Sequence, residues 1–339
     1  MRGLTKGQQA DGWLVISDRQ SDAGLARSLA SGLFVIEFTL PLPDAALLCD
    51  VAIQDQGERG FSLFYQPEAG LILRNRQGAR LVRHVLPGRL PDEPGTARLA
   101  FAFDCAADRW DLRLELVGRP DLPAWTARGV APLPLVPADI ARMSEERRRQ
   151  SRHPAVLWFG LAQGVAAPAR IAWIGLRSPV ETPRGPVAAG RLQPGDLVLT
   201  EDDGALPLLS SLRMALPACG SFAPVLLRAP FLPVQHDLLL SSDQMVLMRG
   251  PEVEYLFGDD EVLVPAAALV DGRTALMEQR RMVVPSVALL FDRPAILNVD
   301  GCGLLAALPQ DRAPRLCLQE YEAQMLMTQL GRGAARRRA

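Results

Sequence analysis

Tight turns in the middle of the chain constrain its fold most. In residues 181–187, Pro183-Arg184-Gly185 suits a tight turn, because proline presets φ and glycine accepts a positive φ. Residues 190–200 repeat this chemistry at Pro194-Gly195-Asp196 and continue as an apolar, β-favouring segment. Asp202-Asp203-Gly204 then predicts a third turn. This part of the chain therefore reads as short strands joined by turns.

The same residues resemble the opening of the Hint domain, the Hedgehog/intein self-processing module, in the bacterial form found in alpha-proteobacterial proteins. In that family a Cys-led stretch runs into T-P-x-G and then L-x-P-G-D-x-V-x-T, which residues 182–185 and 192–200 match. Residues 261–272 similarly fit E-V-L-V-P-A-x-x-L-V-D-G. The resemblance implies a Hint-type β fold over about residues 170–310.

The resemblance also implies a chemistry that can be checked residue by residue. A Hint domain breaks its own backbone when a thiol or hydroxyl at its first residue attacks the preceding carbonyl. The family's Cys lies about nine residues before the Thr of T-P-x-G, a position held here by Trp173. An indole ring cannot perform this acyl shift.

The family's histidine positions are replaced as well. They hold Gln244, Ala288 and Pro294, and a glutamine amide cannot shuttle a proton near neutral pH. Asn298 is not followed by Cys, Ser or Thr, so it is not a splice junction. We therefore assign no catalytic, cofactor or metal residues, and predict a Hint domain without self-splicing or self-cleaving activity that acts as a binding or scaffold protein.

Two other functions stay open. The chain could process itself through Ser178 or Cys219 as nucleophile, with His236 as the helper. Each residue also has a structural alternative: Ser178 as a linker serine, Cys219 as a loop or core thiol, and His236 as a surface or capping histidine. It could also bind a glycan through its N-terminal half.

Short alternating segments recur along that half. Residues 13–16, 33–40, 47–54, 60–65, 71–73, 79–86, 98–104 and 110–117 read as strands separated by turns, the pattern of an antiparallel sandwich. A proline-rich stretch then runs to Pro137, residues 139–150 read as a helix with Asp139 as its cap, and residues 156–162 and 170–176 read as the last strands.

This pattern resembles a concanavalin A/laminin-G type jelly roll over about residues 10–176. Such domains often bind glycans, sometimes through Ca²⁺, but the candidate loop acids Asp55, Asp104, Asp108 and Asp121 form no dense cluster. Trp110 and Trp158 lie in apolar alternation, which favours a place in the core.

Composition bears on the class of partner, on disulfide bonds and on the location of the protein. The formal net charge of −1 gives no electrostatic reason to expect a nucleic-acid partner. Five scattered cysteines favour reduced thiols over a disulfide framework. The polar N-terminus and the lack of a long apolar run predict no secretory signal and no membrane span. The predicted location is cytoplasmic, or outside the cell by a signal-independent route, with an unknown protein or glycan as partner.

The predicted class is thus all-β. Residues 1–172 are expected to form the jelly-roll-like β-sandwich and residues 173–312 the degenerate Hint domain. Residues 313–339 are expected to form a C-terminal helix and a basic tail, with Leu318, Tyr321, Met325 and Leu330 on one face of the helix and docking on the parent domain favoured over partner binding.

Overall fold

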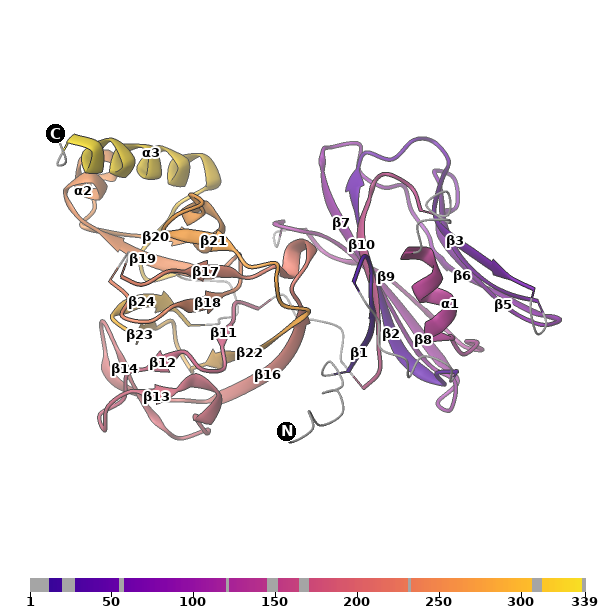
Figure 1. The fold of residues 1–339 in the computed structure, drawn as a ribbon, viewed down its shortest axis with the longest axis horizontal. Helices are drawn as coiled ribbons and strands as arrows, with labels where there is room; N and C mark the ends of the chain where they lie inside the picture. The colour runs from indigo at the N-terminus through magenta and orange to yellow at the C-terminus, as the bar shows by residue number, and fades with distance from the viewer. Residues whose placement is uncertain are drawn as a thin grey trace, which may run out of the picture. The chain divides into compact units, whose positions relative to one another are not determined.

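A computed structural model describes residues 12–19, 28–54, 58–119, 122–144, 152–164, 171–230, 233–306 and 313–336, with the backbone alone at 331–336. Contacts between residues divide the chain into two compact units, Met1–Pro168 and Ala169–Ala339. Figure 1 draws the first unit in indigo to magenta and the second in pink to yellow. No described helix is long and apolar enough to cross a membrane.

The first unit consists of two antiparallel sheets. The larger runs in the order β1 (Trp13–Ile16), β10 (Val156–Ala162), β2 (Ser31–Leu40), β7 (Gly95–Asp104), β8 (Arg109–Leu116) and β9 (Trp125–Gly129). The smaller runs β3 (Ala46–Ile53), β4 (Arg59–Gln66), β5 (Gly70–Gln77) and β6 (Arg80–Leu86). Alternate side chains of both sheets, such as Phe34 and Phe101 from one and Leu63 and Leu73 from the other, share one buried core. The predicted all-β class and N-terminal sandwich are confirmed.

Three details of this unit differ from the sequence predictions. Strand β9 lies in the proline-rich stretch and was missed; its Gly129 is required, because a Cβ there would come within 2.5 Å of the Trp110 ring. Trp158 is buried as predicted, whereas Trp110 is only half-buried and donates its indole N–H to the Val130 carbonyl at 3.0 Å. The predicted strand 170–176 belongs to the second unit.

The predicted helix is shorter than expected. It consists of α1 (Pro137–Ala141) and the 3₁₀ turn η1 (Arg142–Ser144), and residues 145–150 lie outside the described residues. The N-cap is Val136, so the prediction of Asp139 as cap is wrong. Asp139 instead accepts from Arg59 of β4, with Nε to Oδ2 at 2.8 Å, and this ion pair ties α1 to the small sheet.

The second unit contains two further sheets. The six-stranded sheet runs β16 (Ser210–Pro217), β22 (Val283–Leu290), β11 (Ile174–Gly175), β18 (Leu238–Leu240), β17 (Val225–Leu227) and β21 (Ala275–Met277). The nine-stranded sheet runs β13 (Val187–Ala188), β12 (Pro179–Val180), β23 (Ile296–Val299), β24 (Cys302–Leu305), β19 (Met245–Arg249), β20 (Glu261–Pro265) and β25 (Leu316–Cys317), with β14 (Leu197–Thr200) joined to β23 and β15 (Gly204–Pro207). Short helices η3 (Ala189–Arg191), η4 (Gly220–Phe222), α2 (Pro251–Phe257) and η5 (Ala266–Leu269) connect them.

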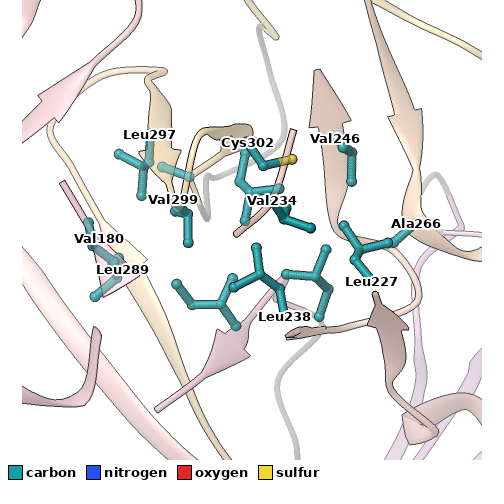
Figure 2. Close-up of a cluster of buried hydrophobic side chains, with 14 of the residues drawn as sticks. Val180, Leu227, Val234, Leu238, Val246, Ala266, Leu289, Leu297, Val299 and Cys302 are labelled. Carbon is teal, nitrogen blue, oxygen red and sulfur yellow. The ribbon is translucent and has the colours of Figure 1, made fainter. Parts of the chain in front are cut away.

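Side chains from both sheets meet in one core. Figure 2 shows part of it, with Leu238 of the six-stranded sheet pointing toward Val299 and Cys302 of the nine-stranded sheet. The predicted turns frame this core: Gly185, Gly195 and Gly204 all have positive φ, of 98°, 92° and 68°. The turn chemistry read from the sequence is therefore confirmed.

The C-terminal helix α3 (Glu320–Arg336) packs on its own unit, against η5, α2 and β20 (Figure 1). Docking on the parent domain, the favoured prediction, is confirmed, and the predicted apolar face is correct at Leu318 and Leu330 but wrong at Tyr321 and Met325. Ala323 and Leu326 are fully buried, whereas Tyr321 and Met325 are exposed. Within the helix, the apolar side consists of Ala323, Leu326, Met327 and Leu330, at helical spacing. The basic tail at 337–339 lies outside the described residues.

Charged side chains hold the segment that leads into α3. Arg315 donates from Nε to Glu261 Oε2 at 2.6 Å and from Nη2 to Asp202 Oδ1 at 2.5 Å. Arg249 also pairs with Glu261, and the two guanidinium groups, Arg315 foremost, hold the pKa of Glu261 below its ordinary value. This network fixes β25 beside β20, the parallel pair of the sheet.

We predict that His84 makes the first unit sensitive to acid. Its ring is buried between Phe101 and Trp110, with centroids 5.2 and 4.7 Å away, and burial lowers its pKa from 6.5 to about 4. Between these values the unfolded state holds the extra proton, so the free energy of unfolding should fall by about 3 kcal/mol as pH drops from 6.5 to 4.

Urea unfolding of the full chain at several pH values measures this loss. His84→Leu should remove it. Leu86→Ala on the same strand should lower stability by a similar amount at every pH. An unchanged pH dependence in His84→Leu would contradict the prediction.

We predict that two neighbouring truncations in α3 lower the free energy of unfolding by very different amounts. Leu326→Ala leaves a cavity in the core and should cost about 3 kcal/mol in the free energy of unfolding. Met325→Ala removes a side chain that is 54% exposed and should cost less than about 0.5 kcal/mol. Chemical denaturation checks both, and equal costs would refute the corrected helix face.

Candidate functional site

The site centres on a small pocket in the core of the second unit, where Trp173 and Gln244 meet. Its volume is about 10 Å³, room for about one water molecule. The lining residues are Ala172, Trp173, Ile174, Gln244, Val287, Leu289, Leu297, Val299, Leu304, Leu305 and Ala306. The residues at the expected nucleophile position and at the first expected histidine position therefore line one pocket.

Strand pairing brings these two positions together. Trp173 precedes β11, whose Ile174 pairs with Leu240 of β18 and Val287 of β22. Gln244 lies in the turn between β18 and β19, and its side chain lines the same pocket as Ile174 of β11. The local sequence supplies the turn: the N–H of Gln244 donates to the Ser241 carbonyl at 3.1 Å.

Ser241 fixes the backbone at the position where a Hint domain would break. Its hydroxyl accepts from the N–H of Trp173 at 3.1 Å, and its own N–H donates to the Trp173 carbonyl at 2.9 Å. Sequence reasoning matched Ser241 to the family's second block but gave it no role. The available signal was its place in that block, three residues before the histidine position.

Gln244 is buried and used for structure. Its Nε2 donates to the Leu305 carbonyl at 2.7 Å and to the Met245 carbonyl at 3.2 Å, which occupies both amide hydrogens. The side chain therefore ties the turn before β19 to the end of β24. It offers no group that takes up a proton near neutral pH.

The other two expected histidine positions lie outside the pocket lining. Ala288 is buried on β22, between the two lining residues Val287 and Leu289. Pro294 is half-buried between β22 and β23. With an indole, an amide and aliphatic side chains, the pocket contains neither a nucleophile nor a general base.

Ser178 lies in the turn between β11 and β12. It is buried, its N–H donates to the Gly175 carbonyl at 3.0 Å, and its carbonyl accepts from the Ala189 N–H at 2.8 Å. The main chain of Ser178 is thus bonded on both sides, within the turn through its N–H and to η3 through its carbonyl.

Cys219 and His236 occupy two other turns. Cys219 is half-buried and stands at the N-cap of η4, after β16. His236 is exposed, precedes β18, and lies with Nδ1 2.9 Å from Asp300 Oδ1. Asp300 Oδ2 also accepts from the N–H groups of Gln235 at 2.8 Å and His236 at 2.6 Å, so this carboxylate caps the loop. His236 is thus a surface histidine held by Asp300, and the cap of this loop is the Asp300 carboxylate.

The remaining thiol of interest is Cys302 on β24. It is buried in the core in Figure 2, and burial raises its pKa to about 12. A thiol with this pKa stays protonated at neutral pH and is a poor nucleophile. The five cysteines form no disulfide.

Two of the candidate loop acids of the first unit hold loop backbone. Asp104 Oδ1 accepts from the N–H groups of Ala106 and Ala107, both at 3.0 Å, and Asp108 Oδ1 accepts from that of Ala131 at 2.8 Å. Asp55 and Asp121 lie outside the described residues. Across the described ranges, no three His, Cys, Asp or Glu side chains gather as a metal site would require.

We predict that Gln244 contributes stability. Gln244→Leu strands the Leu305 carbonyl in the core and should lower the free energy of unfolding by about 2 kcal/mol. Gln235→Leu, on an exposed side chain, is the matched control and should change it by less than about 0.5 kcal/mol. Chemical denaturation of the two variants would expose the prediction as wrong if their costs were equal.

Comparison with known proteins identifies the second unit. Residues 176–309 match the family model described as Hint domain, so the chain contains a Hint domain in this region. No curated protein matches the chain. Among solved structures, the LG1-3 region of the laminin alpha2 chain is similar at 9% identity and a TM-score of 0.28, over 89% of this chain and 57% of that one. The assignment of the first unit as a β-sandwich comes from its two antiparallel sheets.

Proposed function

We propose that this chain is a binding or scaffold protein whose Hint domain does not cleave or splice its own backbone. The observation that carries the proposal is the bonding of Gln244. Where the family places a histidine beside the breaking peptide, this chain has an amide whose two hydrogens bind main-chain carbonyls. The neighbouring nucleophile position holds Trp173, buried to 3% exposure.

The rest of the domain supports a retained framework. The turn residues Gly185 and Gly195 adopt the positive φ that the fold requires, and β14 and β23 pair as part of one sheet. A chain that keeps the fold-determining positions and lacks the reactive groups is suited to hold and present surfaces. The pocket lined by Trp173 and Gln244 then serves as part of the hydrophobic core.

We expect the purified full-length chain to remain one species. Its intact mass should stay at the full-length value through long incubation with a strong thiol, because neither Trp173 nor Gln244 performs an acyl shift. Intact-mass spectrometry with and without the thiol measures this directly.

The fragments would identify any error. Cleavage near residues 172–178 would overturn the proposal, and its loss in Ser178→Ala would assign the nucleophile to that serine. Cleavage lost in Cys219→Ala would assign it to that thiol. Unchanged mass in the parent chain and both variants supports the proposal.

A further inference from the structure

The outward face of the small sheet in the first unit carries an apolar row. Leu47, Phe64, Ile72 and Val85 lie opposite one another on β3, β4, β5 and β6. They point away from the core residues Leu63, Leu73 and Leu86, since side chains alternate along each strand. Leu47 is 49% exposed and Val85 37%, although both are large hydrophobic residues. Phe64 is half-buried and Ile72 is 9% exposed, so the row is open to solvent at its two ends, on the edge strands β3 and β6. Exposed apolar side chains bordered by polar ones are typical of a contact surface.

A polar row runs beside it, two residues away from the apolar row on β4, β5 and β6 and three residues away on β3, where the register shifts. It consists of Asp50, Ser62, Arg74 and Arg83, again one residue per strand in register. Arg74 and Arg83 are exposed and directly opposite, and no ion pair or hydrogen bond to either is found in the described part of the chain. On the same face Arg76 pairs with Glu58, so the isolation of Arg74 and Arg83 is specific to this row.

The polar row contains two guanidinium groups, which only donate hydrogen bonds, and a single carboxylate that could accept them. Like charges opposite each other on adjacent strands repel and destabilise the pair. The hydroxyl of Ser62, next to Arg74, is buried and lacks a hydrogen-bond partner among the described residues. The one carboxylate of the row, Asp50, lies on β3, about 14 Å from Arg83 across three strand spacings. An incoming carboxylate would pair with the exposed guanidinium groups of Arg74 and Arg83, whereas the buried Ser62 hydroxyl is out of its reach.

We infer that this face binds an extended acidic segment of a partner protein, with apolar and acidic side chains two residues apart. Consecutive outward positions on a strand are about 6.7 Å apart, which is also the spacing of same-side residues in an extended peptide. A partner apolar side chain on the apolar row therefore places its acidic neighbour over Arg74 and Arg83. A second copy of the same face would bring guanidinium against guanidinium, so charge excludes self-association here.

The inference extends the proposed function from a binding protein to a binder of acidic, extended polypeptide. It can fail separately, because loss of peptide binding leaves the intact mass of the chain unchanged. Conversely, self-cleavage in the second unit would leave this surface of the first unit in place.

The test uses the full chain and a fluorescent peptide of repeated Leu-Thr-Asp-Thr units, followed by anisotropy at low salt. We expect saturable binding that weakens with salt, and no binding of a Leu-Thr-Asn-Thr peptide. Arg74→Gln/Arg83→Gln should weaken binding at least about tenfold, since two charge-assisted contacts are lost. Leu47→Ser, on an exposed position of the apolar row, should weaken it as well.

The matched control is Arg113→Gln/Arg128→Gln, which removes two charges from β8 and β9 of the other sheet and should leave affinity unchanged. Circular dichroism confirms that each variant is folded. Equal affinity of the two double variants, or no saturable peptide binding, overturns the inference. Binding confined to a sulfated polysaccharide or to anionic phospholipid vesicles also overturns it and assigns the arginines to a polyanion surface.

Discussion

The second unit depends on the paired hydrogen bonds between Trp173 and Ser241. They lock the segment before β11 beside the end of β18, and so decide which side chains enter the core at the point where a Hint domain reacts. With the backbone held in this way, the residue types at positions 173 and 244 decide whether the reactive groups expected of a Hint domain are present there. Here these two positions hold an indole and an amide. The hydrogen bond from the Gln244 amide to the Leu305 carbonyl ties the same region to β24.

Features set by local chemistry could be predicted from the sequence. Period-2 alternation located most strands of the sandwich because alternate side chains face a shared core. Glycines at positive φ located the turns of the second unit, because few other residues adopt that conformation. Trp173 and Gln244, singled out by motif spacing, both line one pocket, because strand pairing brings their segments together.

Features set by tertiary contacts could not. Strand β11 looks like a last strand of the sandwich by its apolar residues alone, but its partners β18 and β22 come much later in the chain. The buried face of α3 is set by its packing on η5, α2 and β20, which covers Ala323 and leaves Tyr321 exposed. Asp139 has the right type for a cap, yet its strongest partner is Arg59, 80 residues away. Ser241 gains its role only when β11 lies beside it.

The packing of Trp173 has a consequence for how such a sequence can change. A single exchange of this indole for a thiol would empty most of a large side chain from the core and cost about 3–5 kcal/mol. That cost is comparable to the whole stability margin of many domains, so the exchange would be lost before any chemistry could repay it. A lone histidine at Gln244 would likewise give up the bond to Leu305 without gaining a nucleophile. Under the proposed function, a self-cleaving form would therefore need several simultaneous substitutions, because each single exchange costs stability before the full set of reactive groups is present.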